Sequence, residues 1–506
     1  MLHPIVCLLL LLVPLTAQPA TAPRPNILFI ISEDNGPELG CYGTPEVRTP
    51  HLDRLAAEGV RFNRAYVTQA GCSQSRASIM TGLYPHQNGQ IGLATWGFRM
   101  YRADTPNIPR NLKAAGYRTG IIGKLHVSPE SAFPFDFAAI PSANFARKNL
   151  PDYTKNAETF FNASAQPFFL SVNFPDAHQP WTRQVDGLPA RPLDGKDVKP
   201  MAYMGVDEPT LREQVANYYN CMNRLDTLVG DLLAALQRSG KADNTLVVYL
   251  GDHGADMLRG KRTSYEGGVR IPLIVRWPAK AKRGQVREEL VSTIDLMPTV
   301  LALAQAEPVT GLPGRSLVPL LRGETSAWRT YLSTEYHTHA ARANFYPQRT
   351  VRDDRYKLIE NLLPGEVNPG HAFTLDGHLG VDLNQAVRSA PADIAAAYAR
   401  MGKPARWELY DLQTDPFEFR DLSTDRDHAA VLARLQEQLA QWRQETADPL
   451  LQPANLVRLK AEISAASKKE ARELSWQYPY YFLGQEPPAV APPEATTKGR
   501  KKKKSP

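Results

Sequence analysis

The sequence predicts an α/β fold in which helices cover both faces of a central sheet, followed by a smaller α+β subdomain. Short, almost wholly apolar runs, each suited to a strand buried on both faces, recur at Asn26–Ile31, Tyr117–Gly123, Pro167–Phe174, Thr245–Gly251 and Pro272–Trp277. Amphipathic helical segments separate these runs. Strands that lack a polar face need a helical layer on each side, which predicts the layered architecture.

Two segments between or after these runs have the spacing of amphipathic helices. The clearer one follows Asp207 and Pro209 and ends before Gly240; its apolar residues are three or four positions apart, at Leu211, Val215, Tyr218, Met222, Leu225, Val229, Leu232 and Leu236. The second covers residues 295–304, and its Pro298 is tolerated because it lies in the first turn.

The pattern changes after about residue 320. Alternating residues predict short antiparallel strands within Arg349–Asn361 and Trp407–Leu412, and one amphipathic helix is predicted over Val431–Thr446. We therefore expect a main domain over residues 24–325 and a C-terminal subdomain over residues 326–450. For residues 451–506 we expect a peripheral helix within 454–474 and a disordered tail beyond Pro487.

The composition excludes several classes of protein. The chain has 506 residues, 43% hydrophobic and 22% charged, as in soluble globular proteins, which excludes a fibrous or disordered chain. Its formal charge is +7, and the six Lys and Arg residues within 498–506 leave only +1 for the rest. The basic charge therefore belongs to a solubilising tail and predicts no nucleic-acid partner.

The N-terminal segment predicts export. Residues 5–15 are almost wholly apolar but too few to cross a membrane, which takes about 20 residues in a helix. They predict a signal peptide over residues 1–17 and an exported protein (periplasmic, secreted or in a lysosome-like compartment) without stable membrane insertion. The alternative is a buried N-terminal helix. Cleavage would leave Cys41, Cys72 and Cys221, too few for a disulfide framework, and a Cys41–Cys221 pair stays open.

Polar residues gather where four of the predicted strands end. They are Glu33 and Asp34, Lys124 and His126, Asp176 and His178, and Asp252 and His253. Any one pair could simply cap the end of a strand at the surface. Open α/β sheets, however, form their ligand-binding sites at the carboxyl ends of strands. Four pairs together therefore predict such a site. Carboxylates suit Ca²⁺ or Mg²⁺, whereas His with a thiolate suits Zn²⁺, so these residues alone leave the metal open.

The segment Cys72–Gly82, CSQSRASIMTG, closely resembles the signature of the sulfatase family. In that family the Cys, or a Ser, is oxidised to formylglycine, whose hydrated form is the nucleophile. Further segments resemble family motifs in the same order along residues 25–449: 26–36, 251–254, 260–268 and 411–422. The resemblance implies an alkaline-phosphatase-like fold with a central mixed sheet, and a sulfatase that depends on a maturation enzyme for its formylglycine.

The resemblance also implies a set of site residues. One Ca²⁺, with Mg²⁺ as the alternative, would be held by Glu33, Asp34, Cys72, Asp252 and His253. Catalysis would involve Cys72 as nucleophile, Arg76 orienting it, Lys124 and Lys261 on the sulfate oxygens, His126 in sulfate elimination and His178 as proton donor to the leaving group. The two histidines could also exchange roles.

A narrower match points to the N-sulfatase branch of the family, in segments 86–89, 118–124, 134–136 and 405–410. It implies removal of the N-sulfate from terminal glucosamine of heparan chains. For the substrate pocket we expect the segments 86–98 and 335–339, with Glu335 and His337 as candidates, or alternatively as the polar end of a strand.

Other functions remain open from the sequence. They are an O-sulfatase acting on another sulfated carbohydrate or an aryl sulfate, a phosphate- or phosphonate-ester hydrolase with the same site, and a silent binder of sulfated glycans with Cys72 unconverted. Expected partners are a sulfated glycan or small sulfated compound and the maturation enzyme, with a homodimer as an open alternative.

Three positions depart from the family's usual residues. Gln74 stands where Pro is usual, Glu33 where Asp is commoner, and His253 where Asn is common. We expect the metal site to survive the two ligand changes, because both residues keep a donor atom.

Overall fold

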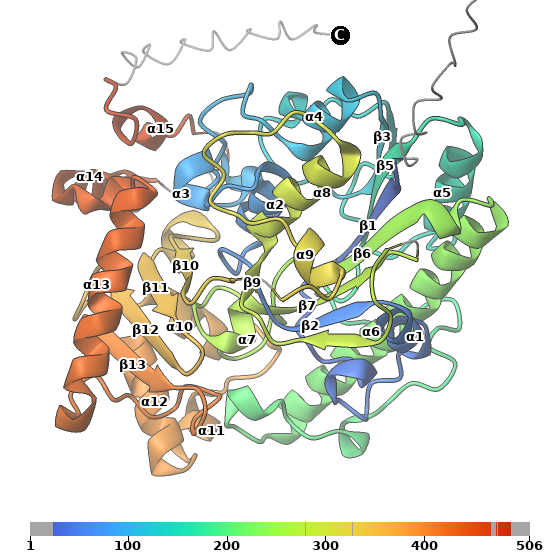
Figure 1. Cartoon of the computed structure of the whole chain (residues 1–506). Coiled ribbons are helices and arrows are strands. Elements are labelled where there is room, and N and C mark those ends of the chain that lie inside the picture. The colour runs from blue at the N-terminus through green and yellow to red at the C-terminus, as the bar shows by residue number, and fades with distance from the viewer. Residues whose placement is uncertain (1–23, 279, 326, 467–471, 473, 487–506) are drawn as a thin grey trace, which may run out of the picture.

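The computed structural model describes residues 24–278, 280–325, 327–466, 472 and 474–486, and it has two sheets (Figure 1). The larger sheet has the strand order β4-β3-β5-β1-β6-β7-β2-β8, with β9 paired to β2. Its strands are β1 (Asn26–Ser32), β2 (Val60–Tyr66), β3 (Arg118–Gly123), β4 (Phe137–Ala139), β5 (Phe168–Phe174), β6 (Thr245–Gly251), β7 (Arg270–Arg276), β8 (Gln285–Arg287) and β9 (Val291–Ser292). Strand β7 runs antiparallel to β6 and β2, whereas β3, β5, β1 and β6 are parallel neighbours, so the predicted mixed sheet is confirmed.

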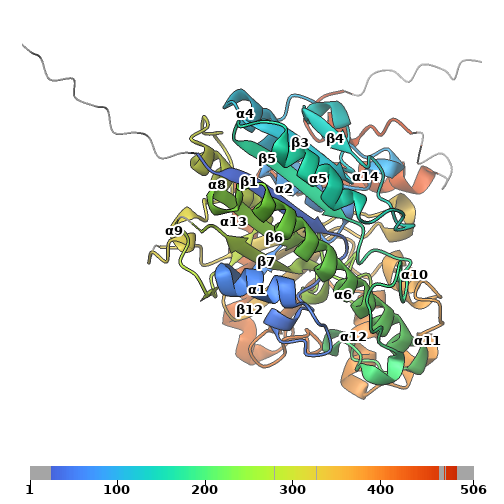
Figure 2. The same ribbon diagram turned by 90° about the vertical axis from the view of Figure 1, so that its right-hand side faces the viewer.

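Helices cover both faces of this sheet, as the apolar strands predict. On one face, α1 (Pro50–Glu58), α5 (Asp152–Asn162) and the long α6 (Pro209–Arg238) pack on residues such as Leu28, Val172 and Tyr249 (Figure 2). The opposite face packs against α2 (Cys72–Thr81), α4 (Ile108–Ala114) and α8 (Leu296–Ala304). Short helices α3 (Pro85–Asn88), α7 (Glu266–Val269) and α9 (Val318–Leu321) lie in the connections.

The C-terminal part is built on a second, antiparallel sheet in the order β10-β11-β12-β13. Its strands are β10 (Leu332–Tyr336), β11 (Gln348–Arg352), β12 (Tyr356–Asn361) and β13 (Trp407–Asp411). Helix α13 (Ala429–Glu445) packs on it through Leu435 and Leu439, and Figure 1 shows the orange-red helix along the outer side of the sheet. The remaining helices are α10 (Pro369–Leu375), α11 (Asn384–Arg388), α12 (Ala392–Gly402), α14 (Pro453–Ala465) and α15 (Tyr478–Tyr481).

The strands and main helices predicted from the sequence are present, and their bounds lie within a residue or two of the predicted ones. The differences concern elements with weaker sequence patterns. Strand β2, which reads VRFNRAY, was missed because polar residues interrupt its apolar positions. The helix expected within 454–474 ends at Ala465. The predicted signal peptide and the tail beyond Pro487 lie outside the described residues. Cys41, Cys72 and Cys221 are all free thiols. In the described part of the chain, no helix is long and apolar enough to cross a membrane.

A buried ionic cluster joins helix α3 to the second sheet. Glu335 at the end of β10 accepts hydrogen bonds from the His86 backbone (2.9 Å) and contacts His86 Nδ1 at 2.6 Å. Arg349 of β11 lies 3.5 Å from Glu335 and donates two bonds of 2.8 Å to Asp448, which also accepts one from Arg443. Burial opposes ionisation of Glu335, but His86 and Arg349 outweigh it and lower its pKa to about 2. The cluster therefore connects α3, which packs next to α2, with the C-terminal part of the chain.

We expect Arg349→Met to destabilise the fold by about 3–5 kcal/mol, because it removes the buried cation that Asp448 and Glu335 share and leaves Arg443 and His86 alone to balance these two carboxylates. Chemical denaturation measures this change. Arg406→Met is the matched control: its side chain is 63% exposed in a pair with Glu360, and its loss should cost less than about 1 kcal/mol. Equal losses for both variants would contradict the role given to the buried cluster.

Candidate active site

The carboxyl ends of four neighbouring parallel strands and the first residue of α2 meet at one place. The residues predicted from the sequence as site residues lie together at this place. They are Glu33 and Asp34 after β1, Lys124 and His126 after β3, His178 after β5, Asp252 and His253 after β6, Lys261 from the following loop, and Cys72 and Arg76 on α2. Asp176 is the exception among the strand-end residues, because its carboxylate pairs with Arg147 and Arg224 behind the site.

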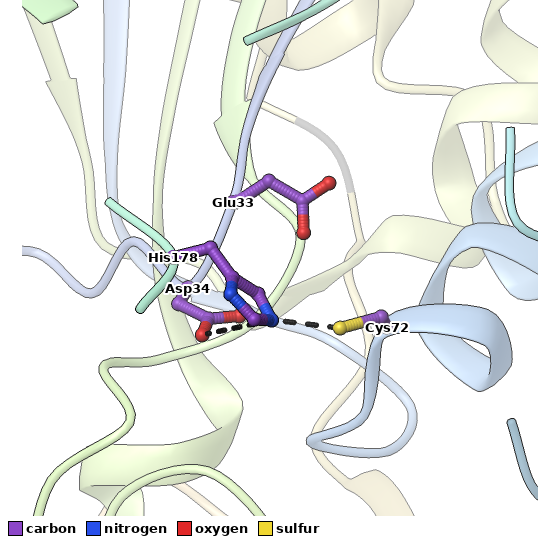
Figure 3. A group of neighbouring side chains, drawn as sticks. All are labelled: Glu33, Asp34, Cys72 and His178. Atoms are coloured by element: carbon purple, nitrogen blue, oxygen red, sulfur yellow. Dashed lines mark hydrogen bonds and ion pairs between the residues drawn. The ribbon is translucent and has the colours of Figure 1, made fainter. Parts of the chain in front are cut away.

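Five potential metal ligands surround Cys72 in two overlapping groups. Donor atoms of Asp34, Cys72, Asp252 and His253 all lie within 4.8 Å of one another, and a second such group contains Glu33, Asp34, Cys72 and His178. Figure 3 shows the side chains of Asp34, Cys72 and His178 converging, with Cys72 Sγ 4.0 Å from Asp34 Oδ1. Asp34 has a φ of 48°, a strained value for a residue other than glycine that is typical of functional sites.

Three buried cations balance the carboxylates. Arg76 donates from Nη2 to Glu33 (2.7 Å) and from Nε to Asp252 (3.0 Å). Lys124 binds the other oxygen of Glu33 at 2.7 Å, and Lys261 binds both oxygens of Asp34 at 3.0 and 2.9 Å. All of these side chains are at most 6% exposed, so none of the charges would be tolerated there alone.

The surroundings of Cys72 favour the thiolate form of its side chain. It is the first residue of α2, where the helix dipole favours negative charge, and only 2% of it is exposed. Burial opposes the thiolate, but Lys124 and Lys261 outweigh burial and hold the pKa of Cys72 well below its usual value. Asp252 and Asp34 likewise overcome burial at His253 and raise its pKa to about 9.

The donor set fits a hard divalent cation better than zinc. Two carboxylates, Asp34 and Asp252, face one another beside Cys72, and the backbone N–H of Asp34 donates to Asp252 Oδ1 at 2.8 Å. Calcium and magnesium prefer such oxygen ligands, whereas structural zinc sites are built mainly from Cys and His. His253, whose Nε2 lies 3.4 Å from Cys72 Sγ, supplies the single nitrogen of this group.

A cavity of about 510 Å³ opens onto this cluster. Cys72, Lys124, His126 and His178 line its inner end, and the walls are mainly apolar: Leu93, Ile121, Leu125, Phe133, Phe135, Ala138, Ala139, Pro141, Ala143 and Phe145. His126 is half-buried, and neither of its two buried ring nitrogens has a partner among the described residues, which leaves both free to bond a ligand.

The structure reveals cavity residues that no sequence motif marked. The Phe145 ring stacks on His178 with centroids 3.8 Å apart, and Lys124 Nζ lies 5.1 Å from its centre. Arg147 fixes this loop by donating to Asp176 (2.6 Å), to the Phe145 carbonyl (2.7 Å) and to the His178 carbonyl. The loop between Ala139 and Asp152 carries no regular pattern, so its contacts could not be read from the sequence.

The segment 335–339 reaches the cavity through a different residue than expected. Glu335 and His337 are completely buried in the ionic cluster with Arg349, and neither lines the cavity. This corrects their prediction as substrate ligands. It favours the alternative prediction, that they form the polar end of a strand. His339 lines it instead, and its Nδ1 has no partner among the described residues. Burial and nearby Lys261 hold the pKa of His339 well below its usual value, so the imidazole is neutral.

Comparison with known proteins agrees with this geometry. The family model described as "Sulfatase" matches residues 25–306, and the one described as "N-sulphoglucosamine sulphohydrolase, C-terminal" matches residues 251–367. The human N-sulphoglucosamine sulphohydrolase is 34% identical over 88% of this chain and 94% of its own length. Human arylsulfatase A is 32% identical over 81% of this chain and 85% of its own.

Solved structures share the fold at lower identity. One, described as "in complex with its substrate D-Glucosamine-2-N, 6-O-disulfate", has a TM-score of 0.64 at 21% identity and covers 84% of this chain and 99% of its own. A phosphonate monoester hydrolase from Silicibacter pomeroyi has a TM-score of 0.59 at 24% identity, and the match covers 84% of this chain and 96% of its own. These neighbours confirm the alkaline-phosphatase-like architecture.

Since the sulfatase model covers more than half of the chain and the human relative nearly all of it, this chain belongs to the sulfatase family and is a hydrolase of sulfuric esters or sulfamates.

Proposed function

We propose that this sulfatase removes the N-linked sulfate from glucosamine at the non-reducing end of a sulfated glycan, using Cys72 converted to formylglycine and one bound Ca²⁺. The observation that carries the proposal is the convergence of Asp34, Asp252 and His253 on residue 72 at the positive end of α2. We further propose that residues 1–17 direct export, supported by their apolar segment.

The metal would be held by Asp34, Asp252, His253 and the residue at position 72, with Glu33 in the second group that shares Asp34 and Cys72 with the first. The ion and the modified side chain would together supply a fixed positive charge and a nucleophilic oxygen. Glu33 contributes by anchoring Arg76 and Lys124, since its two carboxylate oxygens bind one cation each at 2.7 Å.

The cations of the site would bind the sulfate group. Lys124 lines the inner end of the cavity, and Lys261 lies behind it on Asp34. The positive charge of these side chains would hold the anionic sulfate oxygens in place while the bond to the leaving group breaks. Arg76, bonded to Asp252, Glu33 and Asn173, is held rigidly one turn along α2 and would orient the side chain at position 72.

His178 would supply the proton to the leaving group. When the S–N bond breaks, the bonding pair stays on nitrogen, which must take up a proton to leave as an amine. Burial disfavours the charged imidazole, but Asp34, with Oδ2 at 3.9 Å, outweighs burial and raises the pKa of His178, so the ring is suited to carry that proton. His126, at the inner end of the cavity, would act in sulfate release, and the exchanged assignment is the alternative.

The choice of N-sulfate is supported by the human relative and the C-terminal family model, both named for N-sulphoglucosamine. The cavity's size suits one or two sugar units, and His339 offers a neutral imidazole to a sugar hydroxyl or amine. O-sulfatase activity is the alternative favoured by the match to arylsulfatase A, and phosphonate-ester hydrolysis the one favoured by the Silicibacter neighbour.

We expect Cys72→Ala to lower kcat by at least about 10⁴-fold without changing the fold, because it removes the nucleophile and only a small side chain. Steady-state kinetics and circular dichroism measure the two effects. Cys41→Ala is the matched control: this free cysteine lies away from the cavity and its removal should leave kcat within about twofold of the wild type. Activity above a trace in Cys72→Ala would disprove its role as nucleophile.

Removal of divalent cations should abolish activity and lower the melting temperature, because the buried carboxylates of Asp34 and Asp252 lose a cation. Treatment with a chelator, followed by addition of single metal ions, tests this. Calcium or magnesium should restore both properties, and chelator already saturated with calcium is the control. Restoration by zinc alone would show that the ligand set has been misassigned.

Sulfate release should be faster from N-sulfoglucosamine than from 6-O-sulfated N-acetylglucosamine, a synthetic aryl sulfate or a phosphonate monoester. The expectation over the O-sulfated sugar rests on the human relative and the C-terminal family model, both named for N-sulphoglucosamine. The aryl sulfate differs further, because its phenolate can leave without the proton that His178 would deliver. Comparison of kcat/KM for the four compounds provides the test. A preference for either O-sulfated compound would refute N-sulfate specificity and leave the sulfatase assignment standing.

A further inference from the structure

The last described segment of the chain, residues 474–486, folds back from the C-terminal subdomain onto the main domain. Figure 1 shows α15 and α14 beside α3, at the end of the molecule where the nucleophile helix α2 lies. Its aromatic residues form one cluster with the loop 89–99: Trp476, Tyr478 and Tyr481 pack with Ile91 and Phe98. Both family models end before this segment, at residues 306 and 367.

Two side chains of this segment bind the backbone of the loop 89–99. The Tyr478 hydroxyl accepts a hydrogen bond from Arg99 N at 3.0 Å. Its one proton is shared between two carbonyl acceptors, that of Gly89 at 2.8 Å and that of Arg99 at 2.9 Å. It therefore ties together the two ends of the loop. Trp476 donates from Nε1 to the Trp96 carbonyl at 2.8 Å and stacks on Phe98 with centroids 4.6 Å apart.

The other side of the same loop forms part of the active-site cavity. Leu93 and Thr95 line the cavity beside Cys72 and His339. The backbone N–H of Leu93 donates to the His339 carbonyl at 3.0 Å, and that of Ala94 donates to Ser73 Oγ at 2.9 Å, one residue from the nucleophile. The loop thus lies between the nucleophile helix and the C-terminal segment.

We propose that residues 474–486 form a C-terminal clasp that holds the loop 89–99 in place, so that Trp476 and Tyr478 position the Leu93–Thr95 wall of the substrate cavity. Neither residue lines the cavity, so both are positioning residues. The clasp is a specificity element of this chain, because the wall that it positions lines the cavity beside Cys72 and His339.

The clasp is tested with Tyr478→Phe, which removes the hydroxyl and keeps the ring. The matched control is Tyr480→Phe, because Tyr480 lies two residues away and is half-buried, and its hydroxyl makes no hydrogen bond within the described residues. Hydrogen exchange of the peptide 89–99 is compared with that of the core strand β6 (245–251). Exchange requires no substrate, so its result is independent of the proposed function.

In Tyr478→Phe we expect exchange in 89–99 to become roughly five- to tenfold faster while 245–251 is unchanged, the size expected for loss of one buried hydrogen bond. On the best sulfated sugar, KM should rise about three- to tenfold with kcat within about twofold, because binding weakens and the chemistry does not. Tyr480→Phe should match the wild type in both measurements.

Trp476→Phe serves as the second variant. It keeps an aromatic ring against Phe98 but removes the bond to Trp96 and part of the buried indole. It should change exchange and KM in the same direction. Unchanged exchange in 89–99, a loosened loop with an unchanged KM, or equally faster exchange in 89–99 and 245–251 would each overturn the proposal. Failure of N-sulfate specificity would not, because KM can be measured on whichever sulfate compound is turned over.

Discussion

The active site depends on one electrostatic constraint: three carboxylates, Glu33, Asp34 and Asp252, are buried within a few ångströms of one another. Such a group is stable only if positive charge is brought in with it, since an unpaired buried charge costs several kcal/mol. Arg76, Lys124 and Lys261 supply that charge from three separate segments of the chain. The parallel strands, the nucleophile helix and the loop after β6 are therefore fixed relative to one another by the same charges that would bind sulfate.

Much of this site could be predicted from the sequence, because its residues directly follow strands with strong apolar patterns. Glu33, Lys124, His178 and Asp252 each follow a strand that the apolar runs predicted, and parallel neighbours bring such residues to one edge. The strand-end argument alone could not choose the metal; the resemblance to sulfatases supplied that expectation, and the geometry of Asp34 and Asp252 is consistent with it.

The walls of the cavity could not be predicted in the same way. Phe145 lies in an irregular loop fixed by Arg147, whose partners Asp176 and the His178 carbonyl are far away in sequence. His339 lies within the expected segment, but no pattern in the sequence distinguishes it from Glu335 and His337, since the three residues are spaced two apart. Strand β10 ends at Tyr336 before the chain turns toward the cavity. Gln74, which stands where Pro is usual in the family, has a structural explanation: its amide donates to the Thr338 carbonyl at 2.6 Å and so ties the nucleophile helix to the His339 segment.

The central claim is that residue 72 acts as formylglycine within this cluster. The most direct measurement is the mass of the peptide that contains residue 72, in preparations made with and without a coexpressed maturation enzyme, alongside the sulfatase activity of each. The account predicts that converted peptide is lighter than the cysteine form and that activity rises in proportion to the converted fraction. Full activity in a preparation that contains only unmodified cysteine would contradict it.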